Sequence, residues 1–392
     1  MRHSGVSGKK ALIAGFGIGG LCAAIALQKA GWETVIFEKA SERTEGGAGI
    51  VMAANAMKAL GKLGAAERVR MEGMEVGMAE IRTWDGKLIT KLPARKQAER
   101  YGSPSYLIHR AELRGILSDV LAPGTDVQFN KKLENWVQNK GKVTVTFADG
   151  TRAEGDLLIG ADGLHSTVRE GLFGHTPLRY SGYTALRGIS VFRDERYPMA
   201  AGGGFEAWGP GKRFGFSHLG KGRIFWFAAI NAPQGTMAPA SERKRAALKH
   251  FRGWYDPIEA VIEATEGAAV LAHDIFDRKP ASTWHDGCVA LLGDAAHPML
   301  PNLGQGGAQA IEDSLVLAAC LEKHPSDIPA ALLAYEQRRM ARTNRIVRES
   351  RRMGRLVQLE HPAAIRMRNA LLRAMPDRIQ LGRLHWLLGY EV

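Results

Sequence analysis

Two glycine-rich turns, far apart in the chain, carry the groups best suited to hold a phosphate-containing ligand. The first is GFGIGG, Gly15 to Gly20, and the second is GDAAHPMLPNLGQGG, residues 293–307. Each lies between a short apolar run and a helix-like stretch, so free backbone N–H groups and the positive end of a helix dipole face one ligand. The spacing indicates a ligand long enough to be held from both ends of the chain.

The first turn has the pattern of a dinucleotide-binding βαβ unit. Gly15 allows the tight turn, Gly17 lets the backbone approach a pyrophosphate, and Gly20 lets the following helix pack closely on the strand. A second strand ends at Glu38, about 20 residues beyond the glycines, where an acid accepts hydrogen bonds from a ribose 2′-hydroxyl. An acid at this position argues against a 2′-phosphate.

The second turn completes the site for a flavin. Residues 288–292 form a short apolar strand, and Asp294 follows it, within reach of ribityl hydroxyls. Gly304, Gln305, Gly306 and Gly307 then expose backbone N–H groups at a helix start, which suits flavin oxygens and the negative charge of reduced flavin. One βαβ unit is too short to hold flavin adenine dinucleotide, so the two turns together predict FAD.

Two longer motifs and one single position resemble one family. Residues 155–169, GDLLIGADGLHSTVR, and residues 293–313, GDAAHPMLPNLGQGGAQAIED, resemble two fingerprints of the p-hydroxybenzoate hydroxylase superfamily of single-component FAD-dependent monooxygenases. Arg110 matches a third position. The resemblance runs from about residue 9 to about residue 385. Within the superfamily the chain is similar to salicylate, 6-hydroxynicotinate and urate hydroxylases, alkylquinolone hydroxylases and zeaxanthin epoxidase.

The resemblance implies the cofactor, the reaction and a set of contacts. FAD would be bound non-covalently, reduced by NADH or NADPH, and converted by O2 to a C4a-hydroperoxyflavin that hydroxylates an aromatic or heteroaromatic small molecule. The expected cofactor contacts are Gly15, Gly17, Gly19, Gly20, Glu38, Lys39, Val51, Arg110, Val137, Asp162, Asp294, Gly304, Gln305, Gly306 and Gly307.

Three other functions stay open at this point. The chain could epoxidise an isoprenoid-type substrate, or it could be an FAD-dependent reductase or dehydrogenase that makes no use of O2. The third is a flavin-bound interaction protein without catalysis, recruited through its basic C-terminal part. A hydroperoxyflavin that forms transiently when O2 meets the reduced flavin would distinguish a monooxygenase from a reductase or a non-catalytic protein.

The substrate residues are expected on two neighbouring strands, 213–219 and 223–230. Arg213, Gly215 and Ser217 share one face, and by resemblance to urate hydroxylases Arg213 and Phe225 face substrate. Those enzymes have Tyr where this chain has Phe225, which argues against urate itself. The expected substrate-binding residues are Arg213, Phe225, Phe227 and Pro301, which indicate an apolar, planar ring that is either anionic or phenolic. If the strand faces the other way, Phe214, Phe216 and His218 form the pocket.

No side chain is assigned a catalytic role, because the flavin carries the chemistry. His218 and His297 are the two candidates for proton transfer, although a histidine after a strand more often orients a loop. No metal site is expected. The spacing of Cys22, Cys288 and Cys320 fits neither a metal site nor a disulfide framework, which favours the reducing cytoplasm. No stretch approaches 18 uncharged apolar residues, so no membrane-spanning helix is expected.

The alternation of patterns predicts an α/β fold in which a Rossmann-like FAD domain is interleaved with an antiparallel-sheet substrate domain. Gly46 to Gly49 is expected as a loop, and the end of the chain is expected to be helical. The expected parts are FAD-binding residues 1–75, 104–180 and 276–335, substrate-domain residues 76–103 and 181–275, and a basic helical segment, 336–392.

The formal charge of +13 is concentrated late in the chain, where 13 arginines stand against three acids between Arg338 and Arg383. The simplest interpretation is a helical cap whose arginines are solvated or form ion pairs with acidic residues elsewhere on the protein. A basic amphipathic segment also suits the surface of an anionic membrane. No nucleic-acid-binding motif accompanies the charge, so the expected partners are an aromatic small molecule and O2, with a monomer or homodimer as the assembly.

Overall fold

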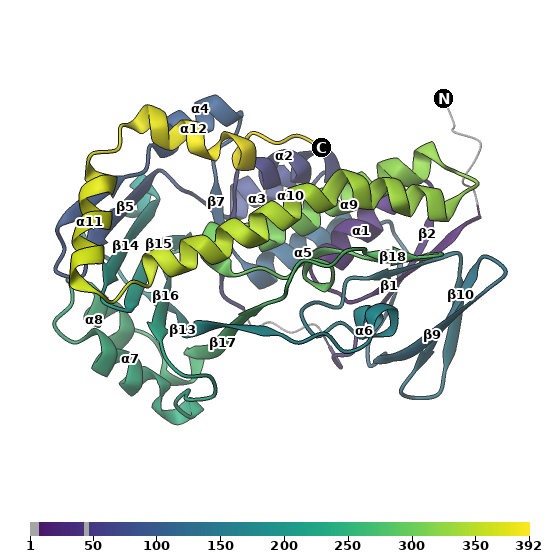
Figure 1. Ribbon diagram of the computed structural model, residues 1–392, viewed down its shortest axis with the longest axis horizontal. Helices are drawn as coiled ribbons and strands as arrows, with labels where there is room; N and C mark the ends of the chain where they lie inside the picture. The colour runs from purple at the N-terminus through teal and green to yellow at the C-terminus, as the bar shows by residue number, and fades with distance from the viewer. Residues whose placement is uncertain (1–7, 43–46) are drawn as a thin grey trace.

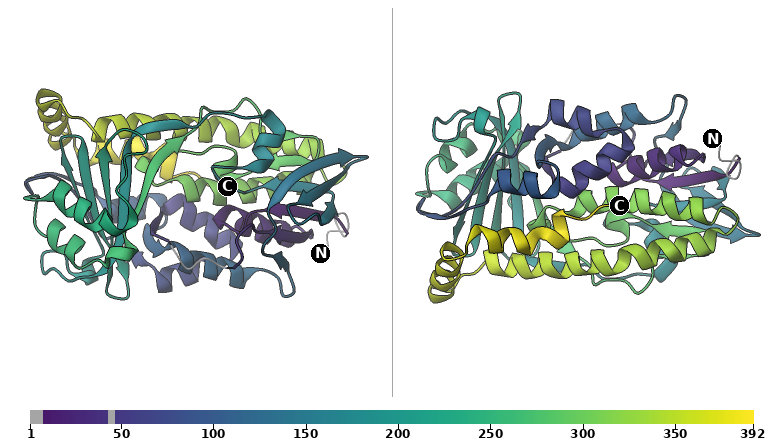
Figure 2. Two further views of the ribbon diagram at one scale, coloured as in Figure 1. Left: turned by 90° about the horizontal axis from the view of Figure 1, so that it is seen from below. Right: turned by 90° about the horizontal axis from the view of Figure 1, so that it is seen from above.

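The computed structural model describes residues 8–42 and 47–392, so Gly46 of the expected loop lies outside the described residues. The molecule is elongated, with one β-sheet toward each end, and the long helix α10 (Ile328–Val357) runs between them (Figure 1). Figure 2 shows the same two regions from below and above. The α/β fold class expected from the sequence is confirmed.

The six-stranded sheet has the order β18-β19-β12-β1-β2-β8 and is parallel except for β18. Its strands are short apolar runs, as expected for a sheet buried on both faces. Their bounds are β1 (Lys10–Ala14), β2 (Glu33–Phe37), β8 (Asp126–Gln128), β12 (Leu157–Gly160), β18 (His285–Asp286) and β19 (Val289–Leu291). The alanine-rich helix α1 (Ile18–Lys29) packs against α9 (Gly306–Lys323), which brings the starts of two helices from distant parts of the chain together.

The seven-stranded sheet has the order β17-β13-β16-β15-β14-β5-β6. Its strands are β5 (Met78–Thr83), β6 (Leu88–Lys91), β13 (Arg179–Val191), β14 (Gly203–Gly209), β15 (Lys212–Gly220), β16 (Arg223–Asn231) and β17 (Leu271–Asp277). One face is closed by α7 (Arg243–Phe251) and α8 (Ile258–Glu263) over an aromatic core that includes Phe214 and Trp226. The other face turns toward the first sheet, because β15 contacts β7 (Tyr106–His109).

Smaller elements connect the two sheets. β3 (Gly49–Met52), β7 and β4 (Met74–Glu75) form one small sheet, and β9 (Leu133–Asn139), β10 (Lys142–Phe147) and β11 (Arg152–Gly155) form another. The helices between them are α2 (Ala54–Leu63), α3 (Ala66–Glu72), α4 (Ala94–Tyr101), α5 (Arg110–Val120) and α6 (Thr167–Phe173).

The last part of the chain is helical, as expected, but α10 begins at Ile328, before the expected boundary at residue 336. α11 (Pro362–Arg373) and α12 (Asp377–Leu388) fold back over α10. Several arginines of the basic segment are used in this docking. Arg342 donates to the carbonyl oxygens of Trp386 (2.6 Å) and Leu387 (2.9 Å), and Arg345 lies 4.0 Å above the Trp386 ring.

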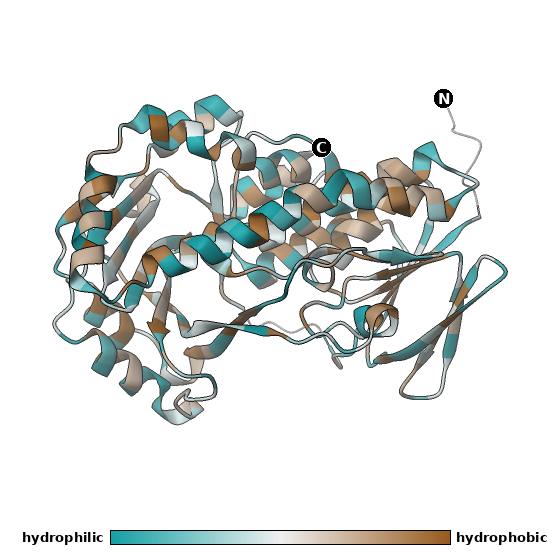
Figure 3. Ribbon diagram, viewed as in Figure 1, coloured by the Kyte–Doolittle hydropathy of each residue, from teal (hydrophilic) through white to brown (hydrophobic). Residues whose placement is uncertain are grey.

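In the hydropathy view (Figure 3), brown apolar residues gather where helices meet the two sheets. Among the described helices, none combines the length and apolar character needed to cross a lipid bilayer.

Candidate cofactor and substrate site

The first glycine turn has the backbone geometry that the sequence predicts. Gly15 has φ +108°, and a β-carbon there would lie 2.5 Å from the carbonyl oxygen of Ala161. A β-carbon at Gly20 would collide with the carbonyl oxygen of Gly15. At Gly17, in contrast, nothing lies within 4 Å of the position of a β-carbon. The open side of the turn is therefore at Gly17, where a pyrophosphate would approach.

Beside this turn lies a cavity of about 350 Å³, lined by Gly15, Gly17, Glu38, Lys39 and Asp162 among others. Glu38 is held by its own chain: Oε2 accepts a hydrogen bond from the Phe16 N–H and Oε1 from the Ala40 N–H, both at 2.9 Å. The fixed carboxylate still has lone pairs for ribose hydroxyls.

Asp162 lies on the opposite wall of this cavity. Its Oδ2 accepts from the N–H groups of Thr167 (2.8 Å) and Val168 (3.2 Å), which begin α6. Its Oδ1 is buried and has no partner within the described structure. Burial raises the pKa of Asp162 above its ordinary value. An unpaired buried oxygen on a ligand cavity is a place where a bound hydroxyl or water would be stabilised.

Val137 does not belong to this group. β9 leaves the cavity at Leu133, which lines it, and then runs outward in a hairpin. Val137 lies on that outer part, with 57% of its side chain exposed. Val137 therefore does not line this cavity, where Lys131, Lys132 and Leu133 supply the wall, and its contact with the cofactor stays a prediction.

The second glycine turn lies at the start of α9. Asp294 is exposed and its Oδ1 is 3.7 Å from the β-carbon position at Gly306. The Gln305 side chain points the other way, since its Oε1 accepts from Asn55 Nδ2 at 2.9 Å. The expected contacts of this turn thus come from the Asp294 carboxylate and from the backbone of residues 304–307.

His297 is buried behind the second turn and is not positioned for proton transfer to a ligand. Its Nε2 lies 2.6 Å from Asp313 Oδ2, and the same oxygen accepts from the Gly293 N–H at 3.0 Å. Although burial alone would raise the pKa of Asp313, His297 and Arg339 lower it to about 2. His297 therefore orients the turn.

Arg339 is the centre of this buried polar network. It donates to Asp313 Oδ1 (2.7 Å), Glu312 Oε2 (2.6 Å) and Gln309 Oε1 (2.7 Å) and is fully buried. Asn55 joins the network by donating to Glu312 Oε1 at 2.7 Å. The network ties α2, α9 and α10 together directly behind the second turn.

β3 connects the second turn to the seven-stranded sheet. A β-carbon at Gly307 would lie 2.9 Å from Ile50 Cδ1, and one at Gly49 would lie 2.6 Å from the Phe225 ring. The start of α9, β3 and Phe225 are therefore consecutive layers. Val51 and Arg110, also predicted to contact the cofactor, lie on β3 and at the start of α5, and both are exposed.

On the sheet, the predicted substrate residues share one face. Arg213 pairs with Ala229, Gly215 with Phe227 and Ser217 with Phe225 across β15 and β16. A β-carbon at Gly215 would collide with the Phe227 ring, so the ring lies flat over the glycine. The sequence predicted that Arg213, Gly215 and Ser217 share one face of the sheet, and they share one face in the structure.

Arg213 is buried, with 4% of its surface exposed, and has partners that the sequence did not reveal. It donates to Glu206 Oε1 (3.1 Å) and to Asn302 Oδ1 (2.5 Å), and its guanidinium lies 5.4 Å from the centre of the Phe227 ring. Tyr183 also donates to Asn302 Oδ1, at 3.2 Å. Asn302 follows Pro301, so the second glycine turn reaches the substrate face of the sheet.

His218 lies on the opposite face of β15. It is 4% exposed, its Nε2 donates to the Tyr197 carbonyl oxygen at 2.7 Å, and it neighbours Phe216 in the core beneath α7 and α8. The alternative pocket of Phe214, Phe216 and His218 is thus filled by the protein, and His218 has no access to the substrate face.

Arg187 was not predicted, although it is a charged residue in the middle of the largely apolar strand β13, directly opposite Phe227. It lines a cavity of about 300 Å³ with Gly47, Ala48 and His109. Within the described part of the chain no hydrogen bond or ion pair engages it. Burial, and then the nearby Arg110, lower the pKa of Arg187.

These residues fit FAD. The open side of Gly17 and the unpaired Asp162 oxygen lie on one cavity, and the Asp294 carboxylate and the N-terminus of α9 lie on the path from it to the seven-stranded sheet. When bound, FAD supplies the redox chemistry. The protein supplies the backbone cradle, the apolar sheet face and the polar anchor Arg213–Asn302.

We expect Asp294→Ala to weaken FAD binding by about 1–3 kcal/mol, because the hydroxyls that the carboxylate accepts from would lose their partner. Titration of the deflavinated protein with FAD measures the change, and Asp286→Ala, an acid elsewhere on the same sheet, is the control. FAD affinity equal to that of the wild type would show that Asp294 does not contact the cofactor.

Comparison with known proteins places this geometry among flavoproteins. A family model described as the FAD binding domain matches residues 9–350. The chain is 41% identical to the aurachin C monooxygenase/isomerase of Stigmatella aurantiaca, over 95% of this chain and 96% of that protein. It is 33% identical to the 3-amino-4-hydroxybenzoate 2-monooxygenase of Streptomyces cremeus, over 96% and 94% of the two chains.

Among solved structures, the chain is similar to Klebsiella pneumoniae HpxO complexed with FAD and uric acid. The TM-score is 0.91 at 30% identity, covering 98% of this chain and 97% of that one.

Proposed function

Since the chain belongs to the FAD-binding-domain family and is an FAD-dependent aromatic monooxygenase of the p-hydroxybenzoate hydroxylase superfamily, we propose that it hydroxylates an uncharged, planar heteroaromatic ring. The proposed ring lies on the Phe225–Phe227 face and presents a carbonyl or hydroxyl oxygen to Arg213. The sequence alone left an anionic ring open as well.

The observation that carries the proposal is the pairing of Arg213 before any substrate is bound. Glu206 Oε1 accepts from Arg213 at 3.1 Å and from Trp208 Nε1 at 2.6 Å. A carboxylate of a substrate would have to compete with Glu206 for the guanidinium and would lie close to a like charge. A neutral oxygen needs only one of the Arg213 N–H groups, and Arg213 Nε is buried without a partner.

The aromatic side chains support a flat ring. Phe225 and Phe227 are neighbours on the substrate face, with ring centres 6.4 Å apart. Offset stacking on such rings stabilises a planar ligand and excludes water from the reacting carbon. The Arg213 anchor then fixes which edge of the ring faces the cofactor.

The names of two relatives support a heteroaromatic ring, whereas a third relative is named for 3-amino-4-hydroxybenzoate, a carbocyclic carboxylate. Aurachin C and uric acid are the ligands named for the relative with 41% identity and for the HpxO structure. We take a quinolone-like ring as the best representative for this chain, because Phe225 and Phe227 offer no polar group to a purine ring.

We expect the FAD-bound protein to bind 4-quinolone at least about tenfold more tightly than 4-quinolone-2-carboxylate, a difference of about 1.4 kcal/mol. Arg213→Ala should weaken 4-quinolone binding by roughly 1.5–3 kcal/mol and leave the FAD content unchanged. Glu206→Gln should improve binding of the carboxylate. Dissociation constants come from ligand-induced changes in flavin absorbance, and hydroxylation from stimulated NAD(P)H oxidation and product mass.

The control is Glu195→Gln, which removes an exposed carboxylate of the same sheet region. Tighter binding of the carboxylate by the wild type would refute the neutral substrate and leave the monooxygenase class intact. The Glu206 assignment would be wrong if Glu206→Gln and Glu195→Gln had the same effect.

We also place the protein in the cytoplasm. The support is that Cys22, Cys288 and Cys320 are all buried free thiols, which is usual in a reducing compartment.

A further inference from the structure

We propose that the outer face of α11 binds the surface of a membrane that contains anionic lipids. The proposal concerns where the protein works and does not depend on which substrate it hydroxylates. It begins from an inverted distribution of side chains on α11.

A surface helix normally buries its apolar side chains and exposes its charged ones. On α11 the fully buried residues are Arg368 and Asn369, and of the large apolar side chains Leu372 packs inward, whereas Met367 is 64% exposed and Leu371 is 63% exposed. Isolated apolar residues are common on protein surfaces, but a contiguous apolar stripe marks a contact site. Here Met367 and Leu371 are one turn apart, and the exposed Ala363, Ala370 and Ala374 continue the stripe at helical spacing.

The inversion is held in place by specific contacts. Arg368 lies 4.7 Å above the Trp208 ring and donates to the carbonyl oxygens of Leu356 (3.1 Å) and Val357 (3.4 Å). Arg373 donates to the Leu88 carbonyl oxygen at 3.3 Å. α11 therefore cannot roll over to bury Met367 and Leu371 without losing these bonds.

The charge around the stripe selects the partner. α11 contains three arginines and no acidic residue. The neighbouring Arg355 and Arg378 are exposed, and Ile379, 51% exposed, extends the apolar surface onto α12. The acids on either side of α11 already have partners: Glu360 accepts from Asn231 Nδ2 at 2.8 Å, and Asp377 is paired with Lys96 at 2.9 Å. Apolar side chains rimmed by arginines suit the interface of an anionic bilayer.

The position of α11 agrees with such a contact. The helix lies at one end of the long axis and stands out from the sheet beneath it (Figures 1 and 2). A flat surface could therefore touch α11 without meeting the cofactor-binding end of the molecule.

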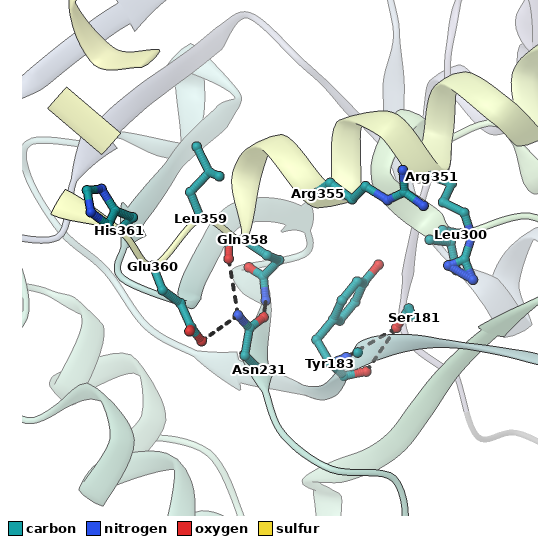
Figure 4. Close-up of a pocket in the computed structure, with 12 residues that line it drawn as sticks. Ser181, Tyr183, Asn231, Leu300, Arg351, Arg355, Gln358, Leu359, Glu360 and His361 are labelled. Atoms are coloured by element: carbon teal, nitrogen blue, oxygen red, sulfur yellow. Dashed lines mark hydrogen bonds between the residues drawn. The ribbon is translucent and has the colours of Figure 1, made fainter. Parts of the chain in front are cut away.

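A cavity of about 400 Å³ lies at the base of α11 (Figure 4). Its outer wall is the α10–α11 connection, with Leu359, Glu360 and His361, and its inner wall includes Tyr183 and Leu300. Tyr183 donates to Asn302, which is the partner of Arg213. Docking through α11 would place the cavity, and through it the substrate face, next to the lipid surface.

The test is sedimentation of the FAD-bound protein with vesicles. The wild type should bind vesicles of phosphatidylcholine mixed with phosphatidylglycerol, should not bind pure phosphatidylcholine, and should be released by salt. Met367→Glu with Leu371→Glu should lower the partition coefficient by about tenfold or more. Arg366→Glu with Arg378→Glu should lower it by about fivefold or more for each arginine removed.

The matched controls are Met71→Glu and Leu333→Glu, which change exposed apolar residues on α3 and at the start of α10. Both should bind vesicles like the wild type, and unchanged FAD content shows that each variant is folded. Equal vesicle binding by the wild type and by Met367→Glu with Leu371→Glu would overturn the proposal. A dimer that is disrupted by these two changes, with no vesicle binding, would assign the surface to a second copy of the chain.

Discussion

Gly17→Val is expected to abolish FAD binding and leave the polypeptide folded. Nothing lies within 4 Å of the β-carbon position at Gly17, so the valine has room in the absence of ligand. The same space is where a pyrophosphate must approach the first turn of α1. Loss of two or more charge-assisted hydrogen bonds, at roughly 1.5–3 kcal/mol each, removes most of the affinity.

The measurement is the visible absorbance of flavin that co-purifies with the variant, together with its far-ultraviolet circular dichroism. Gly115→Val is the control, because a β-carbon at Gly115 in α5 also meets nothing within 4 Å and lies away from the cavity. If the Gly17→Val protein kept its flavin and had the wild-type spectrum, the pyrophosphate would have to bind somewhere other than at Gly17.

Arg339→Met is expected to destabilise the protein by about 3–5 kcal/mol, the usual cost of removing one partner from a buried ion pair. The change leaves Glu312 and Asp313 buried without their shared cation. Urea unfolding of the FAD-bound protein, followed by circular dichroism, gives the free energy. Arg338→Met is the control, since Arg338 is exposed on the same helix and should change stability little.

The same network has a defined acid dependence. Asp313 has a lowered pKa in the folded protein, so its contribution to stability is complete above the ordinary aspartate value of about 4. It is lost as the pH falls toward 2. Arg339→Met should therefore differ most from the wild type near neutral pH, and an equal difference at all pH values would contradict the assignment.

The cofactor site was predictable from the sequence because its determinants are local. Glycines at fixed offsets, a strand before them and an acid after the next strand define the first turn without reference to the rest of the fold. Alternation along β15 and β16 likewise placed Arg213 and Phe227 on one face, since side chains in a strand repeat every second residue.

What the sequence did not reveal depends on packing between distant segments. Glu206 is on the strand that pairs with β15, and nothing in its local sequence marks it as the partner of Arg213. Asn302 reaches Arg213 only because the two sheets meet. These two contacts are the reason why we propose an uncharged ring, where the sequence alone left an anionic ring open. The sequence also does not show that Val137 lies outside the cavity, because a regular strand gives no sign of where it leaves a cavity.

The order of strands in the six-stranded sheet has a consequence for biosynthesis. Ala11 in β1 pairs with Leu157 in β12, and Leu158 pairs with Val289 in β19. The N-terminal βαβ unit therefore leaves the ribosome with an unpaired strand edge, and the sheet is completed only after most of the chain has been made. Pairings of such long sequence separation fold slowly and expose aggregation-prone edges. Chaperone availability during translation, more than the amount of FAD, should then limit the yield of folded protein.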